Sequence, residues 1–417
     1  MDVQKVSFIS LVLLLIGVQG LAFQVKPLDL LYEQCRDEIK SERYEAAIPQ
    51  AILIIDRAQE LGRLEMKLKA SAQLQYCYTK LGKPFDAYRT ITSSLLLAEQ
   101  LQDNLYSGYL HLEAGLTLID LNDHEAALEH LTRSSFYYQL TQQWAQRNKA
   151  EFERATCLRY LGQYELARET LQGLIHEVVA QEQMNLLYRV YNELGLVALN
   201  QGAYDIARNY FIKIIEEAKS TPEGQKAKMY AFYNQTLVAK AEGQLDDLDN
   251  LYRHALSFAH PDWVNEEALV FAMRVKLYES DKNSLDLLYE NDLSVVNHRA
   301  KRFVAQSYQH LIAHHKERGE TDIALVYSQK HNALTADSFE NAQEIERLYN
   351  LYRVKAMQLE SQNQALRDNR DFMNLLWGIC LGVLVTAAAA IIIFYYRRNR
   401  RFENQHRKME AVFSKYS

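Results

Sequence analysis

Hydrophobic positions in the centre of the chain recur with the spacing of amphipathic helices that meet in pairs. A first helix carries Tyr191 and Leu194 on one face. A turn follows at Gly202, and a second helix then carries Ala207 and Phe211. Apolar residues three to four positions apart line one side of a helix. The pattern therefore predicts a helical hairpin that buries one face of each helix.

The same hairpin pattern recurs along the first half of the chain. Small residues fall at the same helix position every 40 residues: Ala47, Ala87, Ala127, Ala167 and Ala207. The turns keep the same period: Glu42, Gly82, Asn122, Gly162 and Gly202. Small residues are needed where two helices cross closely, and we expect Gly195 and Ala207 to leave room for Tyr191 and Phe211. The chain thus predicts a repeat array in which each pair packs on its neighbours.

Beyond residue 220 the pattern weakens but persists, with turns at Gly243 and Gly319 and a degenerate pair at 265–278 and 284–289. We expect about eight helix pairs in total. The order of aromatic, Leu-Gly, aromatic, Ala and Phe resembles the tetratricopeptide repeat, whose usual period is about 34 residues. The resemblance implies an all-α fold, an α-solenoid over residues 23–334. Its longer unit implies helices extended by a residue or two.

A rod is predicted after the array, at residues 335–371, because no glycine or proline interrupts the chain there. Apolar residues recur every seven positions, as in one half of a coiled-coil seam: Ile345, Tyr352, Leu359, Leu366 and Met373. The companion positions are poorer, with Leu348 followed by Lys355 and Gln362. Two interpretations stay open: a weak or switchable coiled coil, and a solvated helix that packs on the last repeat.

Residues 372–396 form an uncharged run of 25 residues, long enough as a helix to cross a bilayer. Trp377 lies near one end and Tyr396 at the other, as in the aromatic belts of membrane spans. The tail at 397–417 begins with four arginines in five residues, which predicts a cytoplasmic side. Small residues four apart form a stripe that favours a homodimer in the membrane, although such residues are common in spans: Gly378, Gly382, Thr386 and Ala390.

Residues 1–22 are typical of a signal peptide. Lys5 precedes an apolar run that is too short to span a membrane, and Gly20 and Ala22 suit a cleavage point. The expected order is therefore signal peptide, exported body, one span and a short cytoplasmic tail. The chain has a formal net charge of −6, and its tail is basic, so the body is more acidic than the whole. An acidic exported body argues against nucleic acid as a partner.

No sequence motif of nucleotide binding, serine hydrolysis or zinc hydrolysis is present, which predicts a protein that is not an enzyme and has no cofactor. His310 and His314 are four apart on one helix, but no third ligand is implied, so no metal site is expected. Among the cysteines we expect buried thiols, and a bridge between Cys35 and Cys77 stays open.

In proteins with this repeat the first helix of each pair lines the binding groove. Alignment of the turns gives candidate partner-binding residues that are mostly basic, aromatic or amide: Lys69, Tyr76, Lys80, Tyr109, Lys149, Phe152, Arg159, Arg189, Asn192, Asn200, Tyr230 and Tyr233. Such a strip suits an extended peptide with acidic groups. The known two-carboxylate clamp of the family is not matched, because Glu153 and Glu193 occupy positions where it needs donors. An ordinary solvated face, or one filled by the rod, is the alternative.

The whole layout resembles the sensory half of bacterial envelope sensors, in which periplasmic repeats, a rod and one span precede a cyclase, kinase or DNA-binding head. The resemblance implies a protein of the bacterial inner membrane, with its body in the periplasm, that binds a protein or peptide partner and performs no catalysis. Two alternatives remain: a structural scaffold for envelope assembly, and the truncated or detached regulatory half of a diguanylate cyclase.

Overall fold

The computed structural model describes residues 27–260, 266–278, 298–335 and 338–413, and every regular element within them is an α-helix. The expected signal peptide and the segment 284–289 lie outside the described residues. Two compact units are present, one extending to Tyr352 and one beginning at Arg353. The all-α prediction is confirmed.

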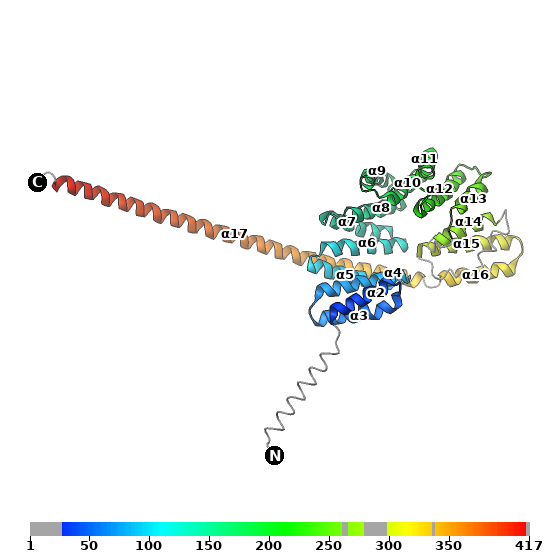
Figure 1. Ribbon diagram of the computed structural model, residues 1–417, viewed down its shortest axis with the longest axis horizontal. Coiled ribbons are helices and arrows are strands. Elements are labelled where there is room, and N and C mark those ends of the chain that lie inside the picture. The colour runs from blue at the N-terminus through cyan, green and yellow to red at the C-terminus, as the bar shows by residue number, and fades with distance from the viewer. Residues whose placement is uncertain (1–26, 261–265, 279–297, 336–337, 414–417) are drawn as a thin grey trace, which may run out of the picture. The chain divides into compact units, whose positions relative to one another are not determined.

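The first unit is a series of helical hairpins that stack in chain order (Figure 1). Most helices of the first half are 17 residues long, and three-residue turns join them. The helices are α2 (Leu28–Lys40), α3 (Tyr44–Glu60), α4 (Leu64–Lys80), α5 (Pro84–Leu101), α6 (Asn104–Asp120), α7 (His124–Leu140), α8 (Trp144–Tyr160), α9 (Tyr164–Ala180), α10 (Met184–Asn200), α11 (Tyr204–Glu217), α12 (Pro222–Ala241), α13 (Leu248–Ser257), α14 (Glu267–Leu277), α15 (His298–Glu317) and α16 (Thr321–Thr335).

Each of the helices α2 to α10 ends in a turn with one residue in the left-handed backbone region. Gly82 and Gly202 have φ values of 65° and 75°, and Asn122 takes the same place with φ of 67°. The next residue then donates back into the finished helix, as the Lys83 N–H does to the carbonyl of Tyr78 at 2.9 Å. This is the hydrogen bond of a Schellman-type helix end, and it fixes the angle at which the next helix starts.

The small residues of the repeat lie at the helix crossings, as expected. The alanines at 47, 127, 167 and 207 are fully buried. A Cβ added to Gly195 would come within 2.5 Å of the Phe211 ring. The absence of a side chain at Gly195 is therefore what lets α10 and α11 approach each other, because interiors are packed without spare volume.

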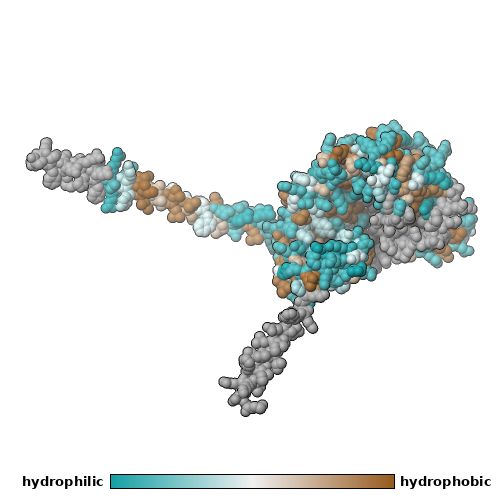
Figure 2. Space-filling view, viewed as in Figure 1, coloured by the Kyte–Doolittle hydropathy of each residue, from teal (hydrophilic) through white to brown (hydrophobic). Residues whose placement is uncertain are grey.

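The long helix α17 (Ser338–Phe413) has 76 residues and contributes to both units. Its stretch Gln343–Arg401 is long and apolar enough to cross a membrane by length and composition. Figure 2 shows an apolar band on this helix with hydrophilic residues on either side of it. The side chains of that band, such as Leu384 and Ile392, are exposed. The expected long helix that continues into an apolar segment is confirmed.

The first turns of α17 pack against the second and third hairpins of the first unit. Ile345 and Tyr352 are buried, and the Tyr352 hydroxyl donates to Glu99 of α5 at 3.1 Å. The seven-residue spacing of these two side chains is therefore explained by their packing against the solenoid. The surface that they cover lies on α5 to α7, which differs from the expected packing on the last repeat.

Candidate functional site

Two pockets open on the first-helix face, which is the face formed by the first helix of each hairpin. The central pocket is a cavity of about 740 Å³ between α8, α10, α12 and the start of α14. The N-terminal pocket is a cavity of about 590 Å³ between α2, α4, α6 and α8. Helix α8 contributes to both, with residues 143–149 in the N-terminal pocket and residues 152–160 in the central one.

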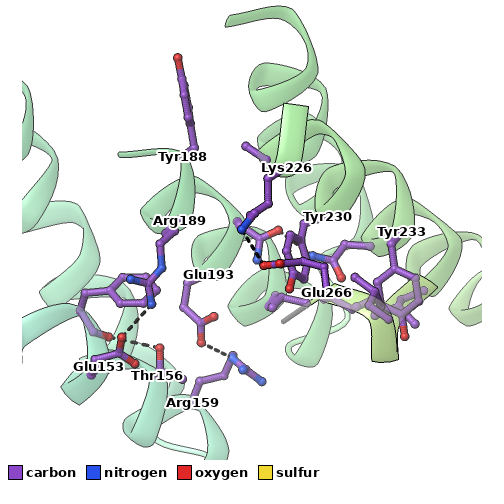
Figure 3. Close-up of a pocket in the computed structure, with 18 of the residues that line it drawn as sticks. Glu153, Thr156, Arg159, Tyr188, Arg189, Glu193, Lys226, Tyr230, Tyr233 and Glu266 are labelled. Atoms are coloured by element: carbon purple, nitrogen blue, oxygen red, sulfur yellow. Dashed lines mark hydrogen bonds and ion pairs between the residues drawn. The ribbon is translucent and has the colours of Figure 1, made fainter. Parts of the chain in front are cut away.

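Three ion pairs hold the cations of the central pocket (Figure 3). Arg159 Nε lies 2.5 Å from Glu193, and both side chains are buried. Arg189 lies 2.7 Å from Glu153, and Lys226 lies 2.9 Å from Glu266. Each pair joins helices of different hairpins, so the pocket wall is cross-linked by charge. A buried arginine and carboxylate are tolerated only as such a pair.

Aromatic rings lie beneath the same arginines. The Arg189 guanidinium lies 4.3 Å from the centre of the Phe152 ring, and that of Arg159 lies 4.2 Å from Tyr160. Guanidinium groups favour the faces of aromatic rings, which fixes their orientation. The guanidiniums are thus held between a carboxylate and a ring.

The central pocket is consequently not basic, because its three cations are paired with carboxylates and a fourth carboxylate, Glu223, also lines it. Amides and phenols make up most of its other polar groups, including Asn185, Asn200 and Tyr230. The Asn234 side-chain amide donates to Asn192 at 2.6 Å. Burial raises the pKa of Tyr233 to about 12, so its hydroxyl stays protonated at neutral pH. The wall offers neutral hydrogen-bond donors and acceptors.

The N-terminal pocket has a different charge. Its lining carries three cations, Arg36, Lys69 and Lys149, against the single carboxyl of Glu113. Burial raises the pKa of Glu113, although Lys149 opposes the shift. Five tyrosines complete the wall: Tyr32, Tyr76, Tyr106, Tyr109 and Tyr138.

A hydrogen-bond chain runs through the floor of the N-terminal pocket. The Tyr109 hydroxyl donates to the side-chain carbonyl of Gln75 at 2.8 Å, and the Gln75 amide donates to Glu113 at 3.2 Å. The side-chain oxygen of Gln73 is buried in this wall and has no hydrogen-bond partner in the described part of the chain. A buried acceptor without a partner is unfavourable, so a donor brought by a ligand would stabilise it.

Eleven of the twelve sequence-predicted residues line one of the two pockets. Phe152, Arg159, Arg189, Asn192, Asn200, Tyr230 and Tyr233 line the central pocket, and Lys69, Tyr76, Tyr109 and Lys149 line the N-terminal one. Lys80 does not line either pocket; its amine lies 5.3 Å from the Tyr76 ring. The fold brings the predicted residues together, and their role in binding stays a prediction.

Sequence reasoning missed several lining residues. From the sequence, Glu153 and Glu193 are only residues that do not fit a two-carboxylate clamp. In the structure they form ion pairs with Arg189 and Arg159. Tyr32 and Tyr106 also line the N-terminal pocket, and alignment of the first helix of every hairpin would have found both. Glu266 follows a stretch where the repeat is degenerate, and no pattern indicated it.

Cysteines and metal-ligating groups offer no alternative site among the described residues. No group of three His, Cys, Asp or Glu side chains there has the arrangement of a metal site. Cys35 and Cys77 are buried free thiols in the core of the first two hairpins. Burial raises the pKa of Cys35 to about 12, which keeps this thiol protonated and unreactive.

Comparison with known proteins identifies the repeat. The tetratricopeptide repeat family matches residues 188–221, the hairpin whose pattern is clearest. No curated protein matches the chain by sequence.

Three solved structures illustrate the similarity of fold. The apo form of the quorum sensor NprR from B. thuringiensis has 14% identity and a TM-score of 0.50, over 84% of this chain and 95% of that chain. NprR in complex with its cognate peptide NprX has 15% identity and a TM-score of 0.49, over 81% and 95%. A Rap protein complexed with competence and sporulation factor has 13% identity and a TM-score of 0.47, over 75% and 99%. At these identities only the fold, a solenoid of tetratricopeptide-like hairpins, is established.

Proposed function

We propose that this protein is a non-catalytic, membrane-anchored receptor or adaptor that binds an extended peptide, or an extended segment of a protein, on its first-helix face. The observation that carries the proposal is the pair of pockets that share α8 on this face. Each pocket has the volume of a small-molecule site, so each holds only a few side chains. A partner that fills both must reach from one to the other along α8, which an extended chain does.

The chemistry of the central pocket suits a peptide backbone. An extended segment presents one N–H and one C=O per residue, and these groups must be satisfied when they leave water. Asn185, Asn192 and Asn200 lie about two turns apart along α10, and each side-chain amide has donor and acceptor groups. Tyr230 and Tyr233 of α12 line the same pocket (Figure 3). Because its three cations are already paired with carboxylates and Glu223 adds a further negative charge, this wall disfavours anions and suits neutral polar groups.

The N-terminal pocket gives the partner a direction. Lys69 and Lys149, together with Arg36, which is paired with Glu33 of the same helix, outnumber Glu113, whose raised pKa weakens its negative charge further. An acidic side chain or a terminal carboxylate is therefore favoured here, since charge-assisted hydrogen bonds are the stronger ones. We propose a partner whose acidic part lies at α2–α6 and whose neutral polar part lies at α8–α12.

The ionic groups of the central pocket are arranged for structure and not for proton transfer. Glu153, Glu193 and Glu266 each form an ion pair with a cation of a neighbouring hairpin. A general acid or base needs a pKa close to the working pH and access to a reacting atom. The proposal therefore assigns recognition and no reaction to this site.

The membrane part of the proposal rests on α17. Its apolar band is exposed over a length sufficient to span a bilayer, and exposed leucines and isoleucines are unfavourable in water. We propose that residues 372–396 cross the inner membrane of a bacterium, that 397–417 lie in the cytoplasm, and that 23–334 lie in the periplasm after removal of 1–22. The protein then acts as the input of an envelope sensor or as an adaptor.

Peptide binding is tested by selecting a library of random displayed peptides on the full-length protein in lipid nanodiscs. We expect enriched sequences that combine an acidic group with neutral polar residues. Tyr230→Ala and Asn200→Ala should abolish the enrichment, because both change the pocket wall. Phe136→Ala, which removes an exposed aromatic ring on the second helix α7, is the matched control. Enrichment that is unchanged by both pocket variants would contradict the proposed site.

Anchoring is tested separately in bacterial cells. The full chain should stay with membranes during alkaline extraction, and a version that ends before Phe372 should appear in the periplasmic fraction. A truncated chain that remains bound to membranes, or one found in the cytoplasm, would contradict the assigned span or the assigned side.

A further inference from the structure

Two buried histidines face each other between the helices of the third hairpin. His111 of α6 and His130 of α7 place their Nδ1 atoms 2.8 Å apart, and neither ring is accessible to solvent. At this distance one Nδ1 donates a proton and the other accepts it, which requires that at least one ring is neutral. The Nε2 atoms of both rings are buried and have no hydrogen-bond partner among the residues that the structure describes.

The start of α17 covers this pair with two tyrosines. The ring centre of His130 lies 5.7 Å from that of Tyr349 and 5.4 Å from that of Tyr352. His111 lies 6.4 Å from Tyr352 and stacks on Tyr137 of α7 at 5.7 Å. The histidines are therefore buried partly by the solenoid and partly by a helix more than 200 residues later in the chain.

Hydroxyl contacts hold the two tyrosines in place. The Tyr349 hydroxyl donates to Glu129 of α7 at 2.6 Å, and that of Tyr352 donates to Glu99 of α5 at 3.1 Å. Arg133 of α7 approaches the Tyr352 hydroxyl at 3.5 Å. These contacts orient the two tyrosine rings over the histidines. They do not supply a counter-charge for a protonated histidine.

Charge on either histidine is disfavoured in this enclosure. Burial lowers the pKa of His130 to about 3, and Arg133 adds to the shift. Burial lowers the pKa of His111 well below its ordinary value, with smaller contributions from His130 and Arg133. Tyr88 of α5 also packs its ring against His130, and its phenol offers no negative charge because burial raises its pKa. The carboxylates of Glu99 and Glu129 are engaged by the tyrosine hydroxyls.

We propose that His111 and His130 form an acid-sensitive latch, which holds the start of α17 on helices α5 to α7 while both rings are neutral and releases it when either ring takes up a proton. Release exposes the rings to water, where the imidazolium is solvated. The device does not depend on the proposed peptide binding, since its groups are not in either pocket.

The direction of the pH dependence follows from the lowered pKa values. In the docked state His130 stays neutral down to about pH 3 and burial likewise holds the pKa of His111 well below its ordinary value, whereas a released and hydrated histidine is protonated below about pH 6.5. The docked state is thus fully stabilised above pH 6.5 and loses stability as the pH falls below it. For each histidine that becomes hydrated, the release equilibrium should shift about tenfold by pH 5.5 and more below that.

The latch is tested by hydrogen–deuterium exchange on the full-length protein in nanodiscs, corrected for the intrinsic effect of pH on exchange. Peptides that cover residues 345–352 should lose protection about tenfold or more between roughly pH 7.5 and pH 5.5. Protection in α10 and α11 should stay constant over this interval. Protection of 345–352 that does not change with pH would overturn the proposal.

Variants separate the latch from a purely structural role. His111→Gln together with His130→Gln should keep the segment protected at both pH values, and His176→Gln, an exposed histidine of α9, should leave the response unaltered. Should the double variant be poorly folded, the imidazole signals of the wild type and of Tyr349→Ala/Tyr352→Ala give an independent NMR readout. Two histidines should be neutral at pH 5.5 in the wild type and protonated in the tyrosine variant. Equal titration of both histidines in the two proteins would refute the latch.

Discussion

Arg159 and Glu193 form an ion pair that joins two successive hairpins from inside the solenoid. The side chains are 8% and 6% exposed, and the arginine Nε lies 2.5 Å from the carboxylate. A charge removed from water is strongly unfavourable unless its partner stays beside it. The pair therefore fixes the contact between α8 and α10 and shapes the floor of the central pocket.

Removal of one partner should consequently destabilise the fold. We expect Glu193→Ala to lower the free energy of unfolding by about 3–5 kcal/mol, because Arg159 is left buried without a counter-charge. Urea denaturation followed by circular dichroism measures the change. The matched control is Glu165→Ala, which breaks the exposed pair between Glu165 and Arg168 on α9 and should cost less than about 1 kcal/mol. Equal effects of the two variants would contradict the assigned role.

Two glycines on neighbouring helices should respond to the same substitution with opposite signs. Gly195→Ala places a Cβ within 2.5 Å of Phe211, so we expect a loss of about 1–3 kcal/mol in unfolding free energy. Gly173→Ala on α9 meets no atom within 4 Å and should stabilise the protein by up to about 1 kcal/mol through helix propensity. Urea denaturation of both variants checks the prediction, and a stabilising Gly195→Ala would show that the crossing is not tight.

Local features explain why the sequence predicts the solenoid well. Turn residues such as Gly82 and crossing residues such as Ala127 act within one hairpin, and their 40-residue period makes them visible in a single chain. The register of the turns also determines which side of a first helix faces the pockets. Eleven of twelve predicted binding residues therefore line a pocket.

Contacts between distant residues explain what the sequence did not reveal. Arg189 pairs with Glu153, which is 36 residues away, so the charge compensation of the central pocket depends on how two hairpins are rotated against each other. Tyr352 meets Glu99 across 253 residues. A heptad spacing identified Tyr352 as buried, but no pattern along the chain could specify the helices that bury it.

Association through α17 gives a third prediction. If two copies approach through the stripe of small residues, then Gly378→Leu with Gly382→Leu should reduce dimer formation in a bacterial membrane by a large factor, since bulky side chains separate the helices. Leu384→Phe, on the opposite face of the same helix, is the control. Cross-linking in membranes or a reporter of transmembrane association measures the effect. Dimerisation that survives the double substitution would exclude this stripe as the interface.

The N-terminal pocket gives the last prediction, which concerns the charge of Glu113. Its raised pKa means that it takes up a proton at a higher pH than an ordinary glutamate, so an anionic partner should bind more tightly as the pH falls through this range. Glu113→Gln should tighten binding at neutral pH by roughly tenfold, because it removes the only negative charge of the lining.

A suitable probe is a peptide selected for binding whose acidic residues are replaced by sulfonates, because these stay ionised throughout the titration. Affinity is measured by fluorescence anisotropy on the full-length protein at several pH values. The wild type should show tighter binding at lower pH, whereas Glu113→Gln should show nearly constant and tight binding. Glu125→Gln, an exposed glutamate of α7 outside the pocket, should behave like the wild type. If Glu113→Gln binds the sulfonated peptide no better than the wild type at neutral pH, the anionic part of the partner lies elsewhere on the first-helix face.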